Sequence, residues 1–360
     1  MPNPKFPVKV CSKHNLFKTN QPNIRHYFIL QYTKKTHKQP MELQTKFYPQ
    51  RNITLDYFKL ILTILVLTIH TPIFPNAFIT DLFRNGIARI AVPCYFIING
   101  FYFAFLKNDD KKVFRYLKKI LIMYITWSLI YAGISVYYHY PVFTSVFFGF
   151  HHLWYIVALF GASLIIYLIH KIAKRVNRKI ILVSAIIIYL SAWAILRIFT
   201  NDTYILQNGI SLFRNFLFMG FPFVFVGYYI STLLTQKPIE IRKSLLLFFI
   251  ISGFVLLFAE KTILNYFEIK FLGDFYFSLI FLCPVLFLFI LKISRYKESD
   301  GYMSSFSSGI YLIHILVILL LKMLSNDTYP KDYLFVPILL LSAILSVGII
   351  KLNSRIKIFL

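Results

Sequence analysis

The sequence lacks the motifs that identify several common classes of enzyme and binding protein. It contains no Gly-rich phosphate loop, no Cys/His metal spacing and no nucleophile-elbow motif. Its three cysteines, Cys11, Cys94 and Cys283, show no paired spacing, and two of them lie in apolar stretches. These absences argue against a P-loop nucleotide site, a metal centre or an α/β-hydrolase triad. We expect inert packing cysteines and neither a bound metal nor a bound cofactor.

Acidic residues are also scarce, and the chain is strongly basic as a result. Fourteen Asp and Glu stand against 39 Lys and Arg, which gives a formal net charge of +25. In a soluble chain this surplus would suggest nucleic-acid binding. The chain is 58% hydrophobic, however, which exceeds the apolar share of a soluble domain, and its apolar residues come in blocks. The sequence therefore predicts an all-α, polytopic membrane protein.

Ten stretches have the length and composition of membrane-spanning helices. Each contains roughly 20 mostly apolar residues bounded by charged or turn residues. They lie near residues 53–73, 86–106, 117–138, 152–170, 180–200, 211–234, 244–260, 271–291, 305–325 and 333–350. These stretches predict a bundle of about ten transmembrane helices. Because ten is an even number, the N- and C-termini are expected on the same side of the membrane.

The loop charges predict which side that is. Basic residues are concentrated in alternate loops, around 107–119, 171–179, 237–243 and 292–297, and in the C-terminal segment. The opposite loops carry only Arg84, Lys261, Lys270 and Lys331. Because cytoplasmic loops of membrane proteins are enriched in Lys and Arg, both termini are expected in the cytoplasm. The basic surplus is then mostly topological, and we expect no nucleic-acid partner.

The first 50 residues are basic and polar and contain no long apolar block. They lack the basic, apolar and small-residue order of a cleavable signal peptide. We interpret residues 1–50 as a disordered cytoplasmic arm and residues 51–360 as the transmembrane domain. Alternatively, translation starts at Met41, since the residues that follow it lead directly into the first helix. A native peptide from residues 1–40, detected by mass spectrometry, would exclude the later start.

Two ionisable residues share the first predicted helix. Lys59 and His70 are eleven residues apart, which returns almost to the same azimuth after three turns and separates them by about 16 Å along the axis. A charged group within the bilayer needs a partner, a water-filled cavity or a function. With the N-terminus inside, Lys59 lies in the cytoplasmic third and His70 near the outer end. Asp56, one turn earlier, is placed to pair with Lys59 or to cap the helix.

Other polar residues are predicted at the outer level of His70. Arg89 and Arg214 fall just inside the outer ends of the second and sixth helices, and His152 opens the fourth. A lone histidine in a membrane helix is usually a packing residue. Several cationic and imidazole groups at one depth instead predict a shared polar cavity that favours an anionic ligand.

These segments, taken in order, resemble the integral-membrane acyltransferase-3 family of bacterial O-acyltransferases. The matching segments are Lys59 with His70 after the Leu55-Asp56 pair, RIAVPCYFIINGFYF from Arg89, HLWYIVAL from His152, RNFLFMGFPFVFVGYYIS from Arg214, and GIYLIHIL from Gly309, which contains His314. Three positions depart from the family pattern. Lys59 stands where many members have arginine, Tyr95 replaces a phenylalanine and Asn99 replaces a serine. Lysine offers a point charge without the bidentate fork of arginine.

The resemblance implies a membrane-bound O-acetyltransferase of the bacterial cytoplasmic (inner) membrane. Such enzymes move an acyl group, usually acetyl, from cytoplasmic acyl-CoA to a hydroxyl of an envelope polysaccharide or a lipid-linked glycan. The expected partners are therefore acetyl-CoA as donor substrate, the glycan acceptor and membrane lipids. Because the sequence ends soon after the last predicted helix, we expect no fused hydrolase-like or racemase-like domain.

The same resemblance suggests roles for the unusual residues. Lys59 and Asp56 are expected at the acyl-CoA site, and His70 is expected to act as a general base or to carry the acyl group. Arg89 is expected to stabilise the oxyanion. The residues expected to line the acceptor cavity are His152, Trp154, Arg214 and His314. A transporter or flippase for lipid-linked sugars remains an alternative, because intramembrane charges also mark transport paths.

Overall fold

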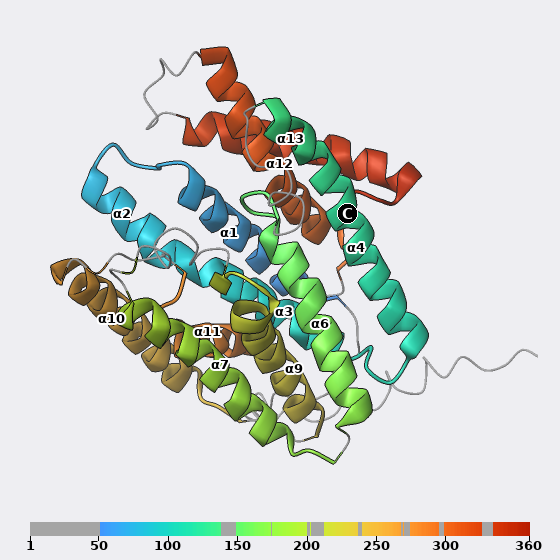
Figure 1. Cartoon of the computed structure of the whole chain (residues 1–360), viewed down its shortest axis with the longest axis vertical. Helices are drawn as coiled ribbons and strands as arrows, with labels where there is room; N and C mark the ends of the chain where they lie inside the picture. The colour runs from blue at the N-terminus through green and yellow to red at the C-terminus, as the bar shows by residue number, and fades with distance from the viewer. Residues whose placement is uncertain are drawn as a thin grey trace, which may run out of the picture. The chain divides into compact units, whose positions relative to one another are not determined.

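The computed structural model describes residues 51–137, 149–173, 175–199, 202, 212–236, 240–267, 269, 274–294, 299–325 and 334–360. All regular secondary structure in these ranges is helical, which confirms the predicted all-α class (Figure 1). The predicted arm at residues 1–50 lies outside them, so the disordered arm and the start at Met41 both stay predictions. The described residues belong to one unit, residues 43–360.

The helices follow the predicted spans closely. They are α1 (Ile53–His70), α2 (Ala77–Asn85), α3 (Ala91–Phe103), α4 (Asp110–Tyr137), α6 (Trp154–Ile172), α7 (Arg178–Ile198), α9 (Phe221–Gln236), α10 (Lys243–Tyr266), α11 (Leu279–Ile293), α12 (Tyr302–Ser325) and α13 (Phe335–Ile356). A 3-10 turn, η1 (Ile87–Ile90), joins α2 to α3, and a π-helical turn, η2 (Phe216–Gly220), leads into α9. Within the described ranges, nine helical segments are long and apolar enough to cross a membrane, and α11 is shorter.

The second predicted span begins earlier than residue 86. Helix α2 extends it back to Ala77, where the Asn76 side chain caps the helix by accepting a hydrogen bond from Ile79 N at 3.1 Å. Polar residues such as Asp81 and Arg84 dilute the apolar pattern here, which is why the sequence indicated a loop. The segment from Ala77 to Phe103 is one candidate span with an internal break.

The eighth predicted span, 271–291, begins later in the structure, at Leu279. The Glu260 carboxylate of α10 accepts hydrogen bonds from Phe277 N at 2.7 Å and Ser278 N at 3.1 Å. It also accepts one from the Ser278 hydroxyl at 3.0 Å. A carboxylate on the free N–H groups of a helix start stabilises that start, so Glu260 sets where α11 begins.

Two glycines allow helices α3 and α9 to cross closely. A Cβ atom at Gly100 would meet Val224 O, and one at Gly227 would meet Ile97 O, both well inside contact distance. Side-chain-free positions let the two backbones touch, as is common between membrane helices. Helix α1 packs against both α3 and α12. The stripe of α1 that carries Lys59 and His70 is thereby placed inside the bundle.

Candidate active site

Helix α1 places Lys59 in its second turn and His70 at its last residue. The helix begins after Asn52, whose side chain accepts a hydrogen bond from Thr54 N at 2.8 Å. Asn52 Nδ2 also donates to Ser294 Oγ at 2.5 Å, which ties the start of α1 to the segment after α11. The two ionisable residues therefore lie toward opposite ends of one anchored helix.

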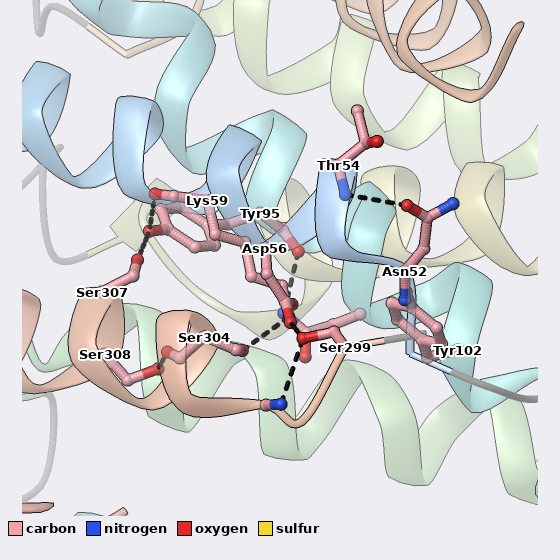
Figure 2. Close-up of polar contacts among 12 residues, drawn as sticks. Asn52, Thr54, Asp56, Lys59, Tyr95, Tyr102, Ser299, Ser304, Ser307 and Ser308 are labelled. Carbon is pink, nitrogen blue, oxygen red and sulfur yellow. Dashed lines mark hydrogen bonds and ion pairs between the residues drawn. The ribbon is translucent and has the colours of Figure 1, made fainter. Parts of the chain in front are cut away.

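Lys59 is held by contacts from three directions (Figure 2). Its Nζ atom donates to Ser304 Oγ at 3.0 Å and lies 3.6 Å from Asp56 Oδ1. The same atom lies 5.6 Å from the centroid of the Tyr102 ring. Asp56 is 1% exposed and accepts a hydrogen bond from Ser299 Oγ at 2.5 Å. The buried Asp56 carboxylate therefore helps to hold the Lys59 ammonium group in position.

Lys59 lines a cavity of about 360 Å³ between helices α1, α3, α4, α6 and α12. Three basic residues line it, and four tyrosines form much of the remaining wall. The lining residues are Arg51, Lys59, Tyr95, Asn99, Tyr116, Lys119, Ile120, Met123, Tyr155, Ile156, Leu159, Ser304, Ser308, Tyr311, Leu312 and Leu360. The cavity thus combines concentrated positive charge with aromatic surface. Asp56 is absent from this lining.

A hydrogen-bond network stiffens the wall of the cavity. The Tyr95 hydroxyl donates to Lys59 O at 2.6 Å and lies 3.0 Å from Ser307 Oγ. It also lies 2.5 Å from Thr63 Oγ1. Asn99 Nδ2 donates to the Tyr155 hydroxyl at 2.8 Å. Two of the three departures from the family pattern, Tyr95 and Asn99, therefore belong to this wall.

Three histidines, which the sequence placed on separate helices, form a cluster. The ring centroids of His70 and His314 lie 5.3 Å apart, and those of His314 and His152 lie 4.9 Å apart. His152 and His314 are buried, whereas His70 is partly exposed. The structure therefore brings one predicted catalytic residue together with two of the predicted acceptor-site residues.

The hydrogen bonds of the two buried histidines define their neutral tautomers. His314 Nδ1 lies 2.7 Å from Tyr311 O, and His152 Nε2 lies 3.2 Å from Leu312 O. A carbonyl oxygen only accepts, so each of these nitrogens carries the proton. The opposite nitrogens, His314 Nε2 and His152 Nδ1, have no hydrogen-bond partner among the described residues. Each presents a lone pair that is free to accept a proton or a hydrogen bond.

Tyr311 joins the histidine cluster to the cavity. Its ring lines the cavity, and its centroid lies 5.3 Å from that of His152 and 6.0 Å from that of His314. The Tyr311 hydroxyl donates to His152 O at 2.5 Å. A molecule filling the cavity would extend from the basic residues beside Lys59 to the edge of the histidine cluster.

The two predicted arginines meet on a shared carboxylate. Arg89 Nη1 donates to Asp274 Oδ1 at 2.6 Å, and Arg89 Nη2 donates to Asn85 Oδ1 at 2.6 Å. Arg214 pairs with the other oxygen of Asp274. The Arg214 guanidinium also lies 5.9 Å from the centroid of the Trp154 ring. Trp154 follows His152 by two residues, so the arginine cluster lies beside the start of α6, next to the histidine cluster.

The sequence missed several residues of these clusters. Asp274 lies just before α11 in a stretch predicted as apolar span, and its acidic character inside that span was the available signal. Lys119 falls among the loop charges near 107–119, and Arg51 lies just before the first predicted span. The tyrosines of the cavity wall resemble any others in a chain with 25 tyrosines, so composition could not single them out.

Comparisons with known proteins show the family to which the chain is similar. A family model described as an acyltransferase domain matches residues 52–351. The chain is also similar to two amino-acid racemases from Enterococcus faecalis, each at 28% identity. The first match covers 60% of the chain and 32% of that racemase, and the second covers 34% and 20%. The chain thus spans a third or less of these relatives' length. No solved structure matches significantly.

Proposed function

The chain belongs to the acyltransferase family whose model matches residues 52–351, and we propose that this multi-pass membrane acyltransferase is an O-acetyltransferase of the cell envelope. Its donor would be cytoplasmic acetyl-CoA, and its acceptor a hydroxyl of an envelope polysaccharide or lipid-linked glycan. The enzyme would lie in the bacterial inner membrane with both termini in the cytoplasm. The loop-charge asymmetry supports this orientation. Family membership favours this reading over the flippase.

The donor site would be the basic cavity. Arg51, Lys59 and Lys119 line it together, which suits the several phosphates of a coenzyme A molecule. The tyrosine-rich wall suits the thinner pantetheine arm, which carries both apolar and amide groups. The stripe from Lys59 to His70 spans about 16 Å, so the acyl thioester would lie toward the histidines when the phosphates are held beside Lys59.

The histidine cluster would supply the proton chemistry. In our proposal His70 removes the proton of the acceptor hydroxyl, whose oxygen attacks the thioester carbonyl carbon. The new C–O bond forms, the C–S bond breaks, and the thiolate takes the proton from His70 to leave as free coenzyme A. In the two-step alternative, His70 attacks first and carries the acyl group. The lone pair at His314 Nε2 is available to orient the His70 ring.

The arginine pair would supply positive charge near the reacting carbonyl. The Arg214 side chain is 23% exposed, against 7% for Arg89, and its guanidinium carbon lies over the Trp154 ring. Arg214 is therefore the better placed to meet an anionic sugar or the developing oxyanion. The catalytic role predicted for Arg89 would then be exerted partly through Asp274, which both guanidinium groups share.

The observation that carries this proposal is the shared position of Tyr311, which lines the basic cavity and packs against His152 and His314. Purified protein supplied with acetyl-CoA and an envelope glycan acceptor should release free coenzyme A, and His70→Ala protein should not. Envelope glycan from a deletion strain should lack an acetyl ester that the complemented strain restores. A flippase would show neither effect. Unchanged acetyl ester content in the deletion strain would contradict the proposed acceptor.

A further inference from the structure

A second basic pocket lies apart from the residues of the candidate active site. It encloses about 100 Å³ where the end of α6, the start of α7 and helix α9 meet. Its lining residues are Ile166, Ile169, His170, Ala173, Val176, Arg178, Ile181, Phe225 and Tyr228. None of them lines the first cavity. The loop charges of the sequence place this end of α6 and α7 on the cytoplasmic side.

Basic groups from three parts of the chain converge here on Tyr228. Lys107, just after α3, places its Nζ atom 5.3 Å from the centroid of the Tyr228 ring. The Tyr228 hydroxyl lies 3.5 Å from His170 Nδ1. Arg178 completes the group from the first residue of α7 and acts electrostatically on Lys107. Tyr228 is buried and the other three side chains are partly buried, so the charges are not a fully solvated surface cluster.

The described part of the chain provides no carboxylate for these cations. Lys107 and Arg178 form no ion pair there, and the acidic residues nearest in sequence to Lys107 are already engaged. Asp109 pairs with Lys112 at 3.3 Å, and Asp110 pairs with Lys171 at 2.6 Å. Burial and the nearby Arg178 charge lower the pKa of Lys107. Two neighbouring, partly buried cations without a counter-ion are stabilised by a bound anion.

The rim of the pocket is apolar and exposed. Ile172 is 81% exposed and Ile180 is 60% exposed, and Val176 is exposed beside them. In a membrane helix bundle, such side chains contact lipid rather than water. A ligand with an anionic head and hydrocarbon tails would satisfy both the cations and this rim.

We propose that this pocket binds the phosphate headgroup of an anionic phospholipid of the adjacent leaflet. The phosphate would lie among Lys107, Arg178 and the Tyr228 hydroxyl, and the acyl chains would run along Ile172 and Ile180. The bound lipid would fasten the ends of α3 and α6 and the start of α7 to helix α9. This assignment is independent of the proposed acetyl transfer.

The test measures lipid binding and uses a variant pair matched in charge. Full-length protein in neutral detergent is titrated with phosphatidylglycerol, phosphatidylcholine or inorganic phosphate, and bound lipid is counted by native mass spectrometry. The Lys107→Gln, Arg178→Gln protein should bind phosphatidylglycerol roughly tenfold or more weakly than the natural protein. The Lys111→Gln, Lys179→Gln protein removes two exposed charges from the first turns of α4 and α7 and should bind normally.

Two further measurements keep the result interpretable. The Lys107→Arg protein retains the charge and should retain binding, which separates loss of the site from loss of folding. Phosphatidylcholine should not compete, because its headgroup carries no net charge. Equal weakening in the pocket variant and the matched control would overturn the site. Saturation of the same site by inorganic phosphate alone, without any preference for phosphatidylglycerol, would overturn its assignment to lipid.

Discussion

Lys59 is expected to contribute both to donor binding and to stability, and its contact with Asp56 allows mutations to separate these two roles. In Lys59→Gln protein the cavity loses one of its three lining cations, and the buried Asp56 carboxylate loses its charged partner. Asp56 Oδ1 has no hydrogen bond among the described residues, so the ammonium group is its main compensation. Removing one partner of a buried ion pair costs about 3–5 kcal/mol. Lys59 is partly exposed, so we expect a loss near the lower end, about 3 kcal/mol.

The donor affinity should change separately. A hydrogen bond to a charged group contributes about 1.5–3 kcal/mol, so loss of the ammonium group should raise the KM for acetyl-CoA roughly tenfold to a hundredfold. The kcat should change much less, because Lys59 lies about three helical turns from His70. Lys59→Arg should keep most of the affinity, since it restores the charge.

The double variant Lys59→Gln, Asp56→Asn distinguishes the two effects. Neutralising Asp56 removes the uncompensated carboxylate, so the unfolding temperature should recover. The KM should stay high, because no charge has returned to the cavity. The assays are thermal unfolding in detergent and initial rates of coenzyme A release, with an acceptor glycan present, over a range of acetyl-CoA concentrations. An unchanged KM in Lys59→Gln protein, or a KM restored in the double variant, would refute the donor role of Lys59.

Three other changes probe the remaining features. His70→Ala should lower acetyl transfer by about 10²-fold or more while membrane insertion is retained, and full activity would exclude His70 as base or acyl carrier. Asp274→Asn should destabilise the protein by about 3 kcal/mol in thermal unfolding, because the two arginines it bridges would repel each other; an unchanged unfolding temperature would show that they are otherwise compensated. Gly100→Val should prevent the close crossing of α3 and α9 and abolish accumulation of folded protein, whereas the same change at Gly133, which has no neighbour within 4 Å of an added Cβ, should be tolerated.

Much of the fold could be predicted because a bilayer restricts the choices. Long apolar runs identify helices directly, and the alternation of loop charges supports their number. The errors occurred where polar contacts set a helix end. The Asn76 cap begins α2 inside an apparent loop, and Glu260 delays α11 to Leu279. Such contacts join residues far apart in the sequence, so a local pattern does not reveal them.

The candidate site was predictable only in part for the same reason. Intramembrane charge singled out Lys59 and His70, and helical geometry placed them on one stripe. Helical geometry within one segment gives no information about neighbours on other helices. The meeting of His152 and His314, and the bridging of the arginines by Asp274, depend on how the helices pack.

The lysine that departs from the family pattern has local compensation in this bundle. An arginine at this position would offer two parallel N–H groups and would fix its own orientation on a phosphate. A lysine ammonium group is a single charge on a flexible stem and needs to be positioned by its surroundings. Here Asp56 and Ser304 hold the ammonium group, and the Tyr102 ring lies beside it. Loss of the Ser304 hydroxyl should therefore weaken donor binding more in this enzyme than in a relative with arginine. The hydroxyl orients the lysine ammonium group, whereas the planar guanidinium group of arginine orients itself on a phosphate.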